Sequence, residues 1–261
     1  MPPSSLDVLR SWVRTHFGIT FTQDRIALFR SQVETLCRDI GISVDTMLLK
    51  VSCGDREVTQ RLAEAVSTNY TYFFREDSAF TLLRNTVLPK IQGPVRIWSA
   101  AASSGDEAYS IAITCAESLG TAAFERVRVL GTDISARQLR IAEDGVYSLQ
   151  HLDSLNPERR KLWFTPAGLG QFKLQPELRK MCLFRRMNLT AMPWPFTQRF
   201  HAIFLRNVLY YFEPEQGRAI LEACYDACEP GGWLFTSVTE PLIAQNTRWS
   251  SVGVGVYARR G

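Results

Sequence analysis

The sequence predicts an α/β fold in which a small all-helical domain precedes a doubly wound parallel sheet that carries an inserted antiparallel β-subdomain. Three observations lead to this class. Residues 1–66 show only helical periodicity, short apolar runs alternate with helical patterns from Pro94 onward, and the stretch of about 156–188 interrupts that alternation. Strands that alternate with helices are typical of a parallel sheet covered by helices on both faces. The expected domains are therefore 1–66 and 67–261.

Helices are expected throughout the N-terminal domain. Apolar residues recur at the spacing of one helix face in the first of them, at Leu6, Leu9, Val13 and Phe17. The helices expected in this domain span 6–17, 22–38, 44–51 and 57–66. No strand pattern appears among them.

The second domain shows the pattern of the sheet. Its expected strands cover 95–100, 127–133, 200–205 and 233–238, and its expected helices cover 106–119, 135–143 and 213–228. A loop of very small residues, 101–105, follows the first strand, Asp133 ends the second, and a turn is expected at 230–232. Right-handed crossovers place the carboxyl ends of parallel strands along one edge of the sheet, where ligands bind. We therefore expect the ligand site at that edge.

The stretch of about 156–188 is expected to form the inserted antiparallel subdomain. Its turn-forming residues include Pro166, Gly168, Gly170 and Pro176. Short apolar runs at 171–174 and 181–184 lie among them. Short runs separated by such residues are typical of a β-hairpin.

The composition of the 261 residues excludes several classes of protein. Hydrophobic residues make up 46% and charged residues 21%, as in globular rather than disordered chains. No apolar run approaches the roughly 20 residues of a membrane span, and no secretory signal is visible, so a cytoplasmic protein without membrane insertion is expected. The net charge of +4 is dispersed and indicates no nucleic-acid partner. Six cysteines without a CxxC pair and three scattered histidines indicate neither a metal site nor disulfides.

The loop after the first expected strand favours a cationic cofactor. It has one glycine, Gly105, where a dinucleotide-binding fingerprint has three. The acids that follow, Asp106 and Glu107, would repel a pyrophosphate. S-adenosylmethionine carries a sulfonium and an ammonium group and no phosphate, and Asp133 can accept hydrogen bonds from a ribose diol of this cofactor or of NAD. The combination favours S-adenosylmethionine, while the alternative that Asp106 and Glu107 only complement the helix dipole stays open.

Five segments of the chain, taken in order, resemble a known family. Their sequences are TNYTYFFRE at 68–76, WSAAASSGDEAYSIA at 98–112, GTDI at 131–134, NL at 188–189 and RNVLYYF at 206–212. In order and spacing they resemble the chemotaxis receptor glutamate O-methyltransferases of the CheR type. The resemblance extends over nearly the whole chain, and five motifs in order are much more specific than any one of them.

This resemblance implies a Rossmann-like methyltransferase sheet and a reaction. A methyl group would pass from S-adenosylmethionine to glutamate carboxylates, leaving S-adenosylhomocysteine. The acceptors would be methyl-accepting chemotaxis receptors, with their cytoplasmic region as the partner of a monomeric enzyme and the methyl esters serving sensory adaptation. Two alternatives stay open: methylation of another acceptor, RNA or protein, and a non-catalytic adaptor that binds S-adenosylmethionine.

The resemblance also implies site residues. Cofactor contacts are implied at Asn69, Thr71, Arg75, Asp106, Asp133, Asn188, Leu189, Arg206 and Asn207. Arg75 and Tyr211 lie where the family has its catalytic side chains. Arg75 can hold a carboxylate of the acceptor or of the cofactor in a bidentate geometry, and Tyr211 can donate one hydrogen bond to the acceptor. The plainer alternatives are a surface arginine and a tyrosine that packs over the sheet.

Departures from the family pattern concern the cofactor loop and receptor docking. Asp106 stands where glutamate is usual. In the helix at 22–38, Arg25, Arg30 and Arg38 are interleaved with acids, which weakens the basic face that the family presents to acidic receptors. Some members add a receptor tail peptide as a strand to the insert, but here the run 164–174 is short and Pro166 offers no N–H. We expect this chain not to need the tail peptide.

Overall fold

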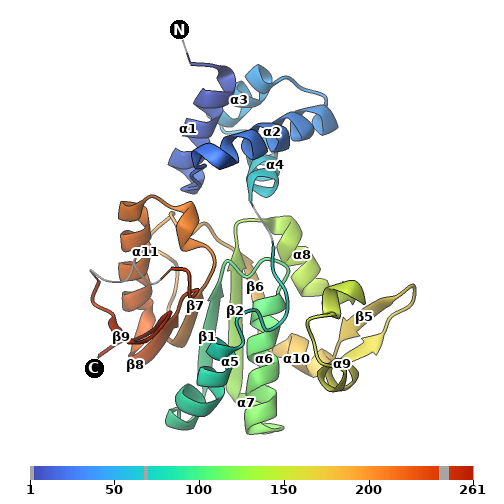
Figure 1. Ribbon diagram of the computed structural model, residues 1–261, viewed down its shortest axis with the longest axis vertical. Coiled ribbons are helices and arrows are strands. Elements are labelled where there is room, and N and C mark those ends of the chain that lie inside the picture. Colours follow the sequence, from blue (N-terminus) through green and yellow to red (C-terminus); the bar gives the residue numbers. More distant parts are fainter. Residues whose placement is uncertain (1–2, 68–69, 241–246, 261) are drawn as a thin grey trace.

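The computed structural model describes residues 3–67, 70–240 and 247–260, and it shows a bundle of helices above one edge of a twisted sheet (Figure 1). The bundle consists of α1 (Ser5–Phe17), α2 (Ile26–Ile40), α3 (Val44–Ser52) and α4 (Arg56–Val66). Side chains of Ser4, Ser43 and Asp55 accept hydrogen bonds from the first turns of α1, α3 and α4, which stabilises these helix starts. The expected helices are confirmed, except that a 3-10 turn at Gln23–Arg25 precedes α2.

Within the described residues, the main sheet has the strand order β6-β2-β1-β7-β8-β10-β9. Its strands are β1 (Val95–Ala100), β2 (Val127–Asp133), β6 (Cys182–Arg186), β7 (Phe200–Leu205), β8 (Cys228–Phe235), β9 (Ser250–Gly253) and β10 (Val256–Ala258). Pairing is parallel from β6 to β8 and antiparallel at β10 and β9. The sheet is therefore mixed, and the expectation of a purely parallel sheet omitted the strands near the C-terminus.

One expected strand boundary is wrong. The turn expected at 230–232 lies inside β8, where the pairing with β7 shifts register. The backbone can follow this path because residue 232 is glycine. A Cβ at this position would lie 2.6 Å from the Cys228 sulfur, which is too close.

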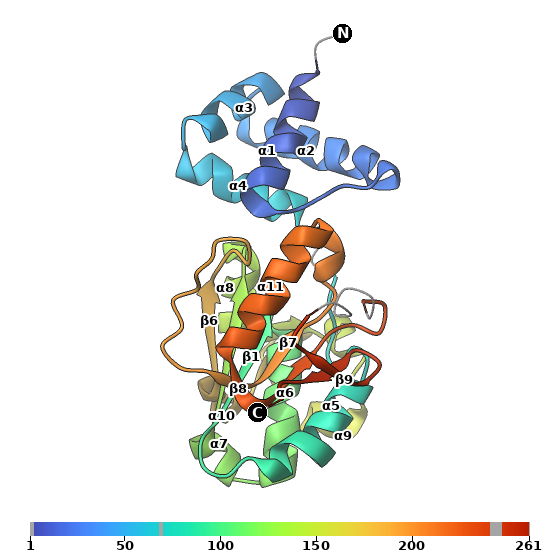
Figure 2. The same ribbon diagram turned by 90° about the vertical axis from the view of Figure 1, so that its left-hand side faces the viewer.

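Helices cover both faces of the sheet. They include α5 (Ser78–Leu82), α6 (Asp106–Leu119), α7 (Ala122–Arg126), α8 (Ala136–Asp144) and α11 (Pro214–Ala227), with a π turn at Leu83–Val87 and short 3-10 turns at Leu88–Lys90 and Leu209–Tyr211. Figure 2 shows α11 over one face, with α6 on the other. Ile111 of α6 packs in one apolar core, and Ile220 and Cys224 of α11 pack in the other. This is the doubly wound architecture that the alternation predicted.

The inserted antiparallel subdomain is present, with different limits. Its strands are β3 (Val146–Ser148), β4 (Phe164–Pro166) and β5 (Gln171–Leu174), in the order β3-β5-β4. A 3-10 turn (Gln150–Leu152) and α9 (Pro157–Trp163) separate β3 from β4, and α10 (Pro176–Met181) leads back to the main sheet.

The range expected for the insert, about 156–188, is therefore corrected. It begins earlier, at β3, and the apolar run 181–184 is not part of it. That run enters β6, which pairs with β2 in the main sheet. Phe184 lies opposite Gly131, whose missing Cβ leaves room for the phenylalanine ring.

The sheet topology places a crevice beside β1. From β1 the chain passes to β2 on one side, and it later reaches β7 on the other side. Such a switch point leaves a crevice at the carboxyl ends of the strands, where ligands bind in folds of this kind. No helix among the described residues is long and apolar enough to cross a lipid bilayer.

Candidate active site

A cavity of about 310 Å³ opens at the carboxyl ends of β1, β2, β6 and β7. The loops that follow these strands form most of its wall, and the helical bundle contributes Phe17, Ile19 and Arg25. The volume is within the range of small-molecule sites. The cavity lies where the topology predicts a ligand.

The structure brings nearly all of the expected site residues together. Those that line the cavity are Thr71, Arg75, Asp133, Asn188, Leu189, Arg206, Asn207 and Tyr211. They come from segments far apart in the sequence. Asn69 lies outside the described residues.

Asp106 is the expected site residue that does not line the cavity. Its fully buried carboxylate accepts a hydrogen bond from Ser104 Oγ at 2.6 Å and lies 2.5 Å from His151 Nε2. The next residue, Glu107, lines the cavity instead. Consecutive helix residues point about 100° apart, so α6 turns Glu107 toward the site and Asp106 toward the insert. The sequence alone could not show which of the two acids faces the cavity, because this depends on how α6 is rotated about its own axis.

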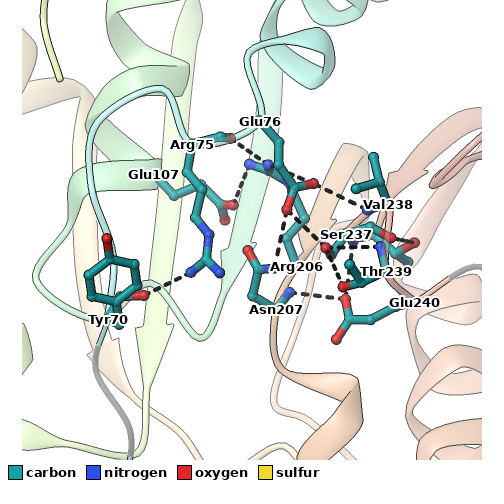
Figure 3. Close-up of polar contacts among 11 residues, drawn as sticks. Tyr70, Arg75, Glu76, Glu107, Arg206, Asn207, Ser237, Val238, Thr239 and Glu240 are labelled. Carbon is teal, nitrogen blue, oxygen red and sulfur yellow. Dashed lines mark hydrogen bonds and ion pairs between the residues drawn. The ribbon is translucent and has the colours of Figure 1, made fainter.

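Arg206 links Glu107 to Glu76 and to the backbone of Arg75 (Figure 3). It lies just after β7, and its side chain is only 1% exposed. Its guanidinium contacts Glu107 at 3.1 Å and Glu76 at 3.3 Å, and it donates to the backbone oxygen of Arg75. Burial raises the pKa of Glu107, and Arg206 opposes that shift. The pairing keeps a charged arginine and an acid together where water has little access.

Glu76 and Glu240 hold the loop after β7. Glu240 is buried, and its carboxylate accepts backbone hydrogen bonds from Asn207, Leu209 and Ser237. Glu76 accepts from Asn207 Nδ2 at 3.2 Å and from Ser237 Oγ at 2.9 Å. Asn207 needs such support, since its φ of 57° is unusual for a residue other than glycine. Sequence reasoning gave neither acid a role, although Glu76 ends the segment 68–76, because the sequence does not show that an acid caps a distant loop.

Asp133 is fixed at the end of β2. Its two oxygens accept from the backbone N–H groups of Ser103 at 2.9 Å and Ser135 at 2.8 Å. Burial raises the pKa of Asp133, and these hydrogen bonds oppose the shift. Its carboxylate borders the cavity and can accept further hydrogen bonds from a ribose diol.

The loop after β1 has the form expected for close contact with a ligand. Ala101 and Ser103 have φ values of 64° and 48°, and both line the cavity. Ser103 Oγ is buried and has no hydrogen-bond partner among the described residues. A buried hydroxyl without a partner is costly, so this atom fits a ligand that supplies one. The acidic floor and the free hydroxyl together fit S-adenosylmethionine.

Aromatic rings and arginines form the mouth of the cavity. Arg75 lies 5.7 Å from the Tyr70 ring and 5.9 Å from the Tyr72 ring, and it donates to the Tyr70 backbone oxygen at 2.8 Å. Tyr211 accepts a hydrogen bond at its hydroxyl from Tyr210 at 3.3 Å. Both candidate catalytic residues therefore face one cavity, with Arg75 already oriented by its own loop.

Asn188 and Leu189 join the cavity to the helical bundle. Asn188 Nδ2 donates to the backbone oxygen of His16 at 2.8 Å, and its Oδ1 accepts from Thr190. Leu189 is buried beside it. The Asn188 amide holds its loop in place and presents that loop to the ligand. Among the described residues, no group of three or more His, Cys, Asp and Glu side chains could hold a metal ion.

The fold and the site define a Rossmann-like methyltransferase that uses S-adenosylmethionine. The family model described as CheR methyltransferase, SAM binding domain, matches residues 69–257. The chain therefore belongs to the CheR methyltransferase family. It is a chemotaxis receptor methyltransferase that modifies protein glutamate.

Curated relatives agree over most of the chain. The chemotaxis protein methyltransferase of Vibrio parahaemolyticus is 33% identical, with 92% of this chain and 90% of that protein covered. Chemotaxis protein methyltransferase 2 of Pseudomonas aeruginosa is 37% identical over 76% of this chain and 72% of its own length. The Escherichia coli chemotaxis protein methyltransferase is 36% identical, with 76% and 70% covered. The resemblance of the five segments is thus confirmed at the level of the family.

Proposed function

We propose that the cavity holds S-adenosylmethionine against Asp133, Glu107 and the loop after β1, and that Arg75 and Tyr211 position the reacting groups. The observation that carries this assignment is the cavity itself, which brings together Arg75, Asp133 and Tyr211 from three distant segments. When bound, the cofactor supplies a methyl group activated by the positive charge on sulfur.

The floor of the cavity is suited to a cation. Asp133 would accept hydrogen bonds from the ribose hydroxyls, and Glu107 would offset positive charge on the cofactor. Arg206 and Asn207 shape this floor through their contacts with Glu76, Glu107 and Glu240 rather than through free charge. Thr71, Asn188 and Leu189 would form the walls, while Asp106 would act only through the position of α6.

No residue of the chain has to remove a proton. A glutamate carboxylate is ionised near pH 7, so the protein has to orient it and exclude water. Tyr211 would donate one hydrogen bond to the acceptor. This hydrogen bond helps to fix the direction of the carboxylate, while a lone pair of the attacking oxygen stays free to react.

The partner would be the cytoplasmic region of chemotaxis receptors, and the enzyme would act as a monomer in the cytoplasm. Residues 1–66 would form a helical domain and 67–261 the methyltransferase domain. The helical domain would touch the receptor near the cavity, because Arg25 of this domain lies at the cavity mouth. A protein acceptor fits the net charge of +4, which is dispersed rather than gathered in a stripe.

Radiolabel transfer to receptor-rich membranes tests the proposal. The purified chain, incubated with methyl-labelled S-adenosylmethionine, should place label on a membrane protein, and mild base should release that label as methanol because esters hydrolyse. Label that resists base would indicate a different acceptor group. Label on added RNA, or no transfer despite cofactor binding, would favour the two alternatives.

A further inference from the structure

We propose that Arg25, a residue of the helical bundle, binds the carboxylate of the acceptor glutamate at the mouth of the cavity. The proposal rests on the proposed function, because it places the acceptor of that reaction. It assigns Arg75 to the carboxylate of the cofactor, a choice that the sequence left open.

Arg25 reaches the cavity from outside the methyltransferase sheet. It is the last residue of the 3-10 turn that precedes α2, and it lines the cavity. Its guanidinium carbon lies 5.6 Å from the centre of the Tyr210 ring and 5.7 Å from that of Tyr211. A guanidinium held by aromatic rings keeps its N–H groups for a planar anion such as a carboxylate.

The position of Arg25 relative to Tyr211 is fixed by the backbone. The N–H and hydroxyl of Thr20 both donate to the Tyr211 backbone oxygen, at 2.7 and 2.8 Å. Gly18 packs against the same loop: a Cβ on Gly18 would lie 2.8 Å from the Phe212 ring, and also 2.5 Å from the Thr190 side chain. The segment before α2 and the loop of Tyr211 are therefore joined, and Arg25 and Tyr211 can act on one group.

The arginines at the cavity differ in what they already bind. Arg206 is paired with Glu76 and Glu107. Arg75 donates one hydrogen bond to a backbone oxygen. Within the described part of the chain, the Arg25 side chain makes no hydrogen bond or ion pair with any carboxylate. The pKa of the exposed neighbour Asp24 is lowered first by the Thr22 hydroxyl, and the charge of Arg25 contributes less.

Two carboxylates have to be held in the reaction, that of the cofactor and that of the acceptor. The backbone oxygen of Arg75 accepts a hydrogen bond from Arg206, which also pairs with Glu107 in the methyltransferase wall of the cavity (Figure 3). Arg25 lies on Tyr211, the proposed acceptor donor. We therefore assign Arg75, whose loop is joined to Arg206 and Glu107, to the carboxylate of the cofactor, and Arg25, which lies against Tyr211, to the carboxylate of the acceptor.

The test compares Arg25→Met with Arg38→Met, which changes an exposed arginine of the following helix, α2, that does not line the cavity. The substrate is a purified cytoplasmic receptor fragment that the wild-type chain methylates. At saturating fragment, Arg25→Met should lower kcat about tenfold or more, because a charged contact to the reacting group is lost. Arg38→Met should keep kcat. Arg25→Lys should recover part of the loss.

Calorimetry with S-adenosylhomocysteine completes the test. Arg25→Met should bind it as wild type does, which also shows that the variant is folded, whereas Arg75→Met should bind it more weakly. A wild-type kcat in Arg25→Met would overturn the proposal, as would equal loss in Arg25→Met and Arg38→Met. A wild-type chain that forms no base-labile ester would instead contradict the proposed function.

Discussion

Tyr211 has two separate roles in the structure. Its backbone oxygen accepts two hydrogen bonds from Thr20, while its ring and hydroxyl lie at the cavity mouth. The backbone role survives any change of side chain. The hydroxyl can therefore be removed without detaching the helical bundle from the loop.

We expect Tyr211→Phe to lower kcat about tenfold and to leave cofactor affinity almost unchanged. The hydroxyl is proposed to donate to the acceptor, and a hydrogen bond to a charged group contributes about 1.5–3 kcal/mol. Steady-state kinetics with saturating cofactor measure the first quantity, and calorimetry measures the second. A collapse of cofactor affinity with intact turnover would make Tyr211 a cofactor contact.

The adjacent acids of α6 give a second test at single residues. Glu107→Gln should weaken S-adenosylhomocysteine binding about tenfold, because the charge lines the cavity. Asp106→Asn should weaken it much less, because its carboxylate faces His151 and Ser104. Thermal unfolding shows whether each variant is folded. The reverse order of affinities would restore Asp106 as the cofactor contact.

Most cavity residues could be predicted because they belong to short motifs at strand ends. Asp133 and Arg206 directly follow apolar runs that read as buried strands. Glu76 and Glu240 could not be predicted, because each acts on a loop that is distant in sequence. Arg25 was noticed only as part of a helix face, since its aromatic partners are more than 180 residues away.

At the scale of elements, a contact between His151 and Asp106 links the insert to the start of α6. His151 lies 2.5 Å from Asp106, and its ring stacks on Tyr147 of β3. The hydrogen bond that the His151 ring donates to the Asp106 carboxylate raises the pKa of His151, and burial opposes this shift. A histidine with a raised pKa stabilises the fold fully below its unfolded pKa and loses that contribution as the pH rises through its folded pKa.

We expect His151→Gln to reduce the free energy of unfolding more at about pH 6 than at about pH 9, because only the protonated ring makes the ion pair. Urea denaturation at both pH values measures the difference. His16→Gln, on an exposed position of α1, is the matched control. Both variants keep His201, whose pKa is lowered mainly by burial. Its contribution to the pH dependence is therefore common to both and cancels in the comparison. An equal loss at both pH values would contradict the ion pair.

The outer strand of the insert bears on receptor docking. β4 is an edge strand of three residues that ends at Pro166, and the turn beyond it exposes Leu169. Proline offers no N–H to a strand added at this edge. The β4 edge therefore offers few backbone groups to which a peptide could pair.

We therefore expect no micromolar binding when the chain is titrated calorimetrically with the aromatic-containing tail peptide of receptors. A tether would act through effective concentration, so its absence would affect the rate only at low receptor concentration. Micromolar binding that disappears when residues in 164–174 are changed would show that the tether is used.

Helices and central strands were the elements that the sequence predicted best. Their periodicity reports burial directly, as in α1 and β1. The edge strand β9 is mostly exposed, and β10, which pairs between β8 and β9, has only three residues, so neither shows that signal. β6 was assigned to the insert because nothing in the run 181–184 shows which strand it will pair with.

At the scale of the whole molecule, the sheet and the bundle form one site together. The crossover between β1 and β7 opens the crevice, and the bundle closes one side of it through Phe17, Ile19 and Arg25. The doubly wound fold and the position of its site could be predicted from the alternation of strands and helices. The contribution of the bundle could not, because contacts between domains leave no periodic pattern.

Calorimetric titration of Asp133→Ala with S-adenosylhomocysteine tests most directly whether this crevice is the cofactor site. Hydrogen bonds to a carboxylate contribute about 1.5–3 kcal/mol each, so affinity should fall at least about tenfold. Asp144→Ala, an exposed acid at the other end of α8, should bind as wild type does. Wild-type affinity in a folded Asp133→Ala variant would contradict the account.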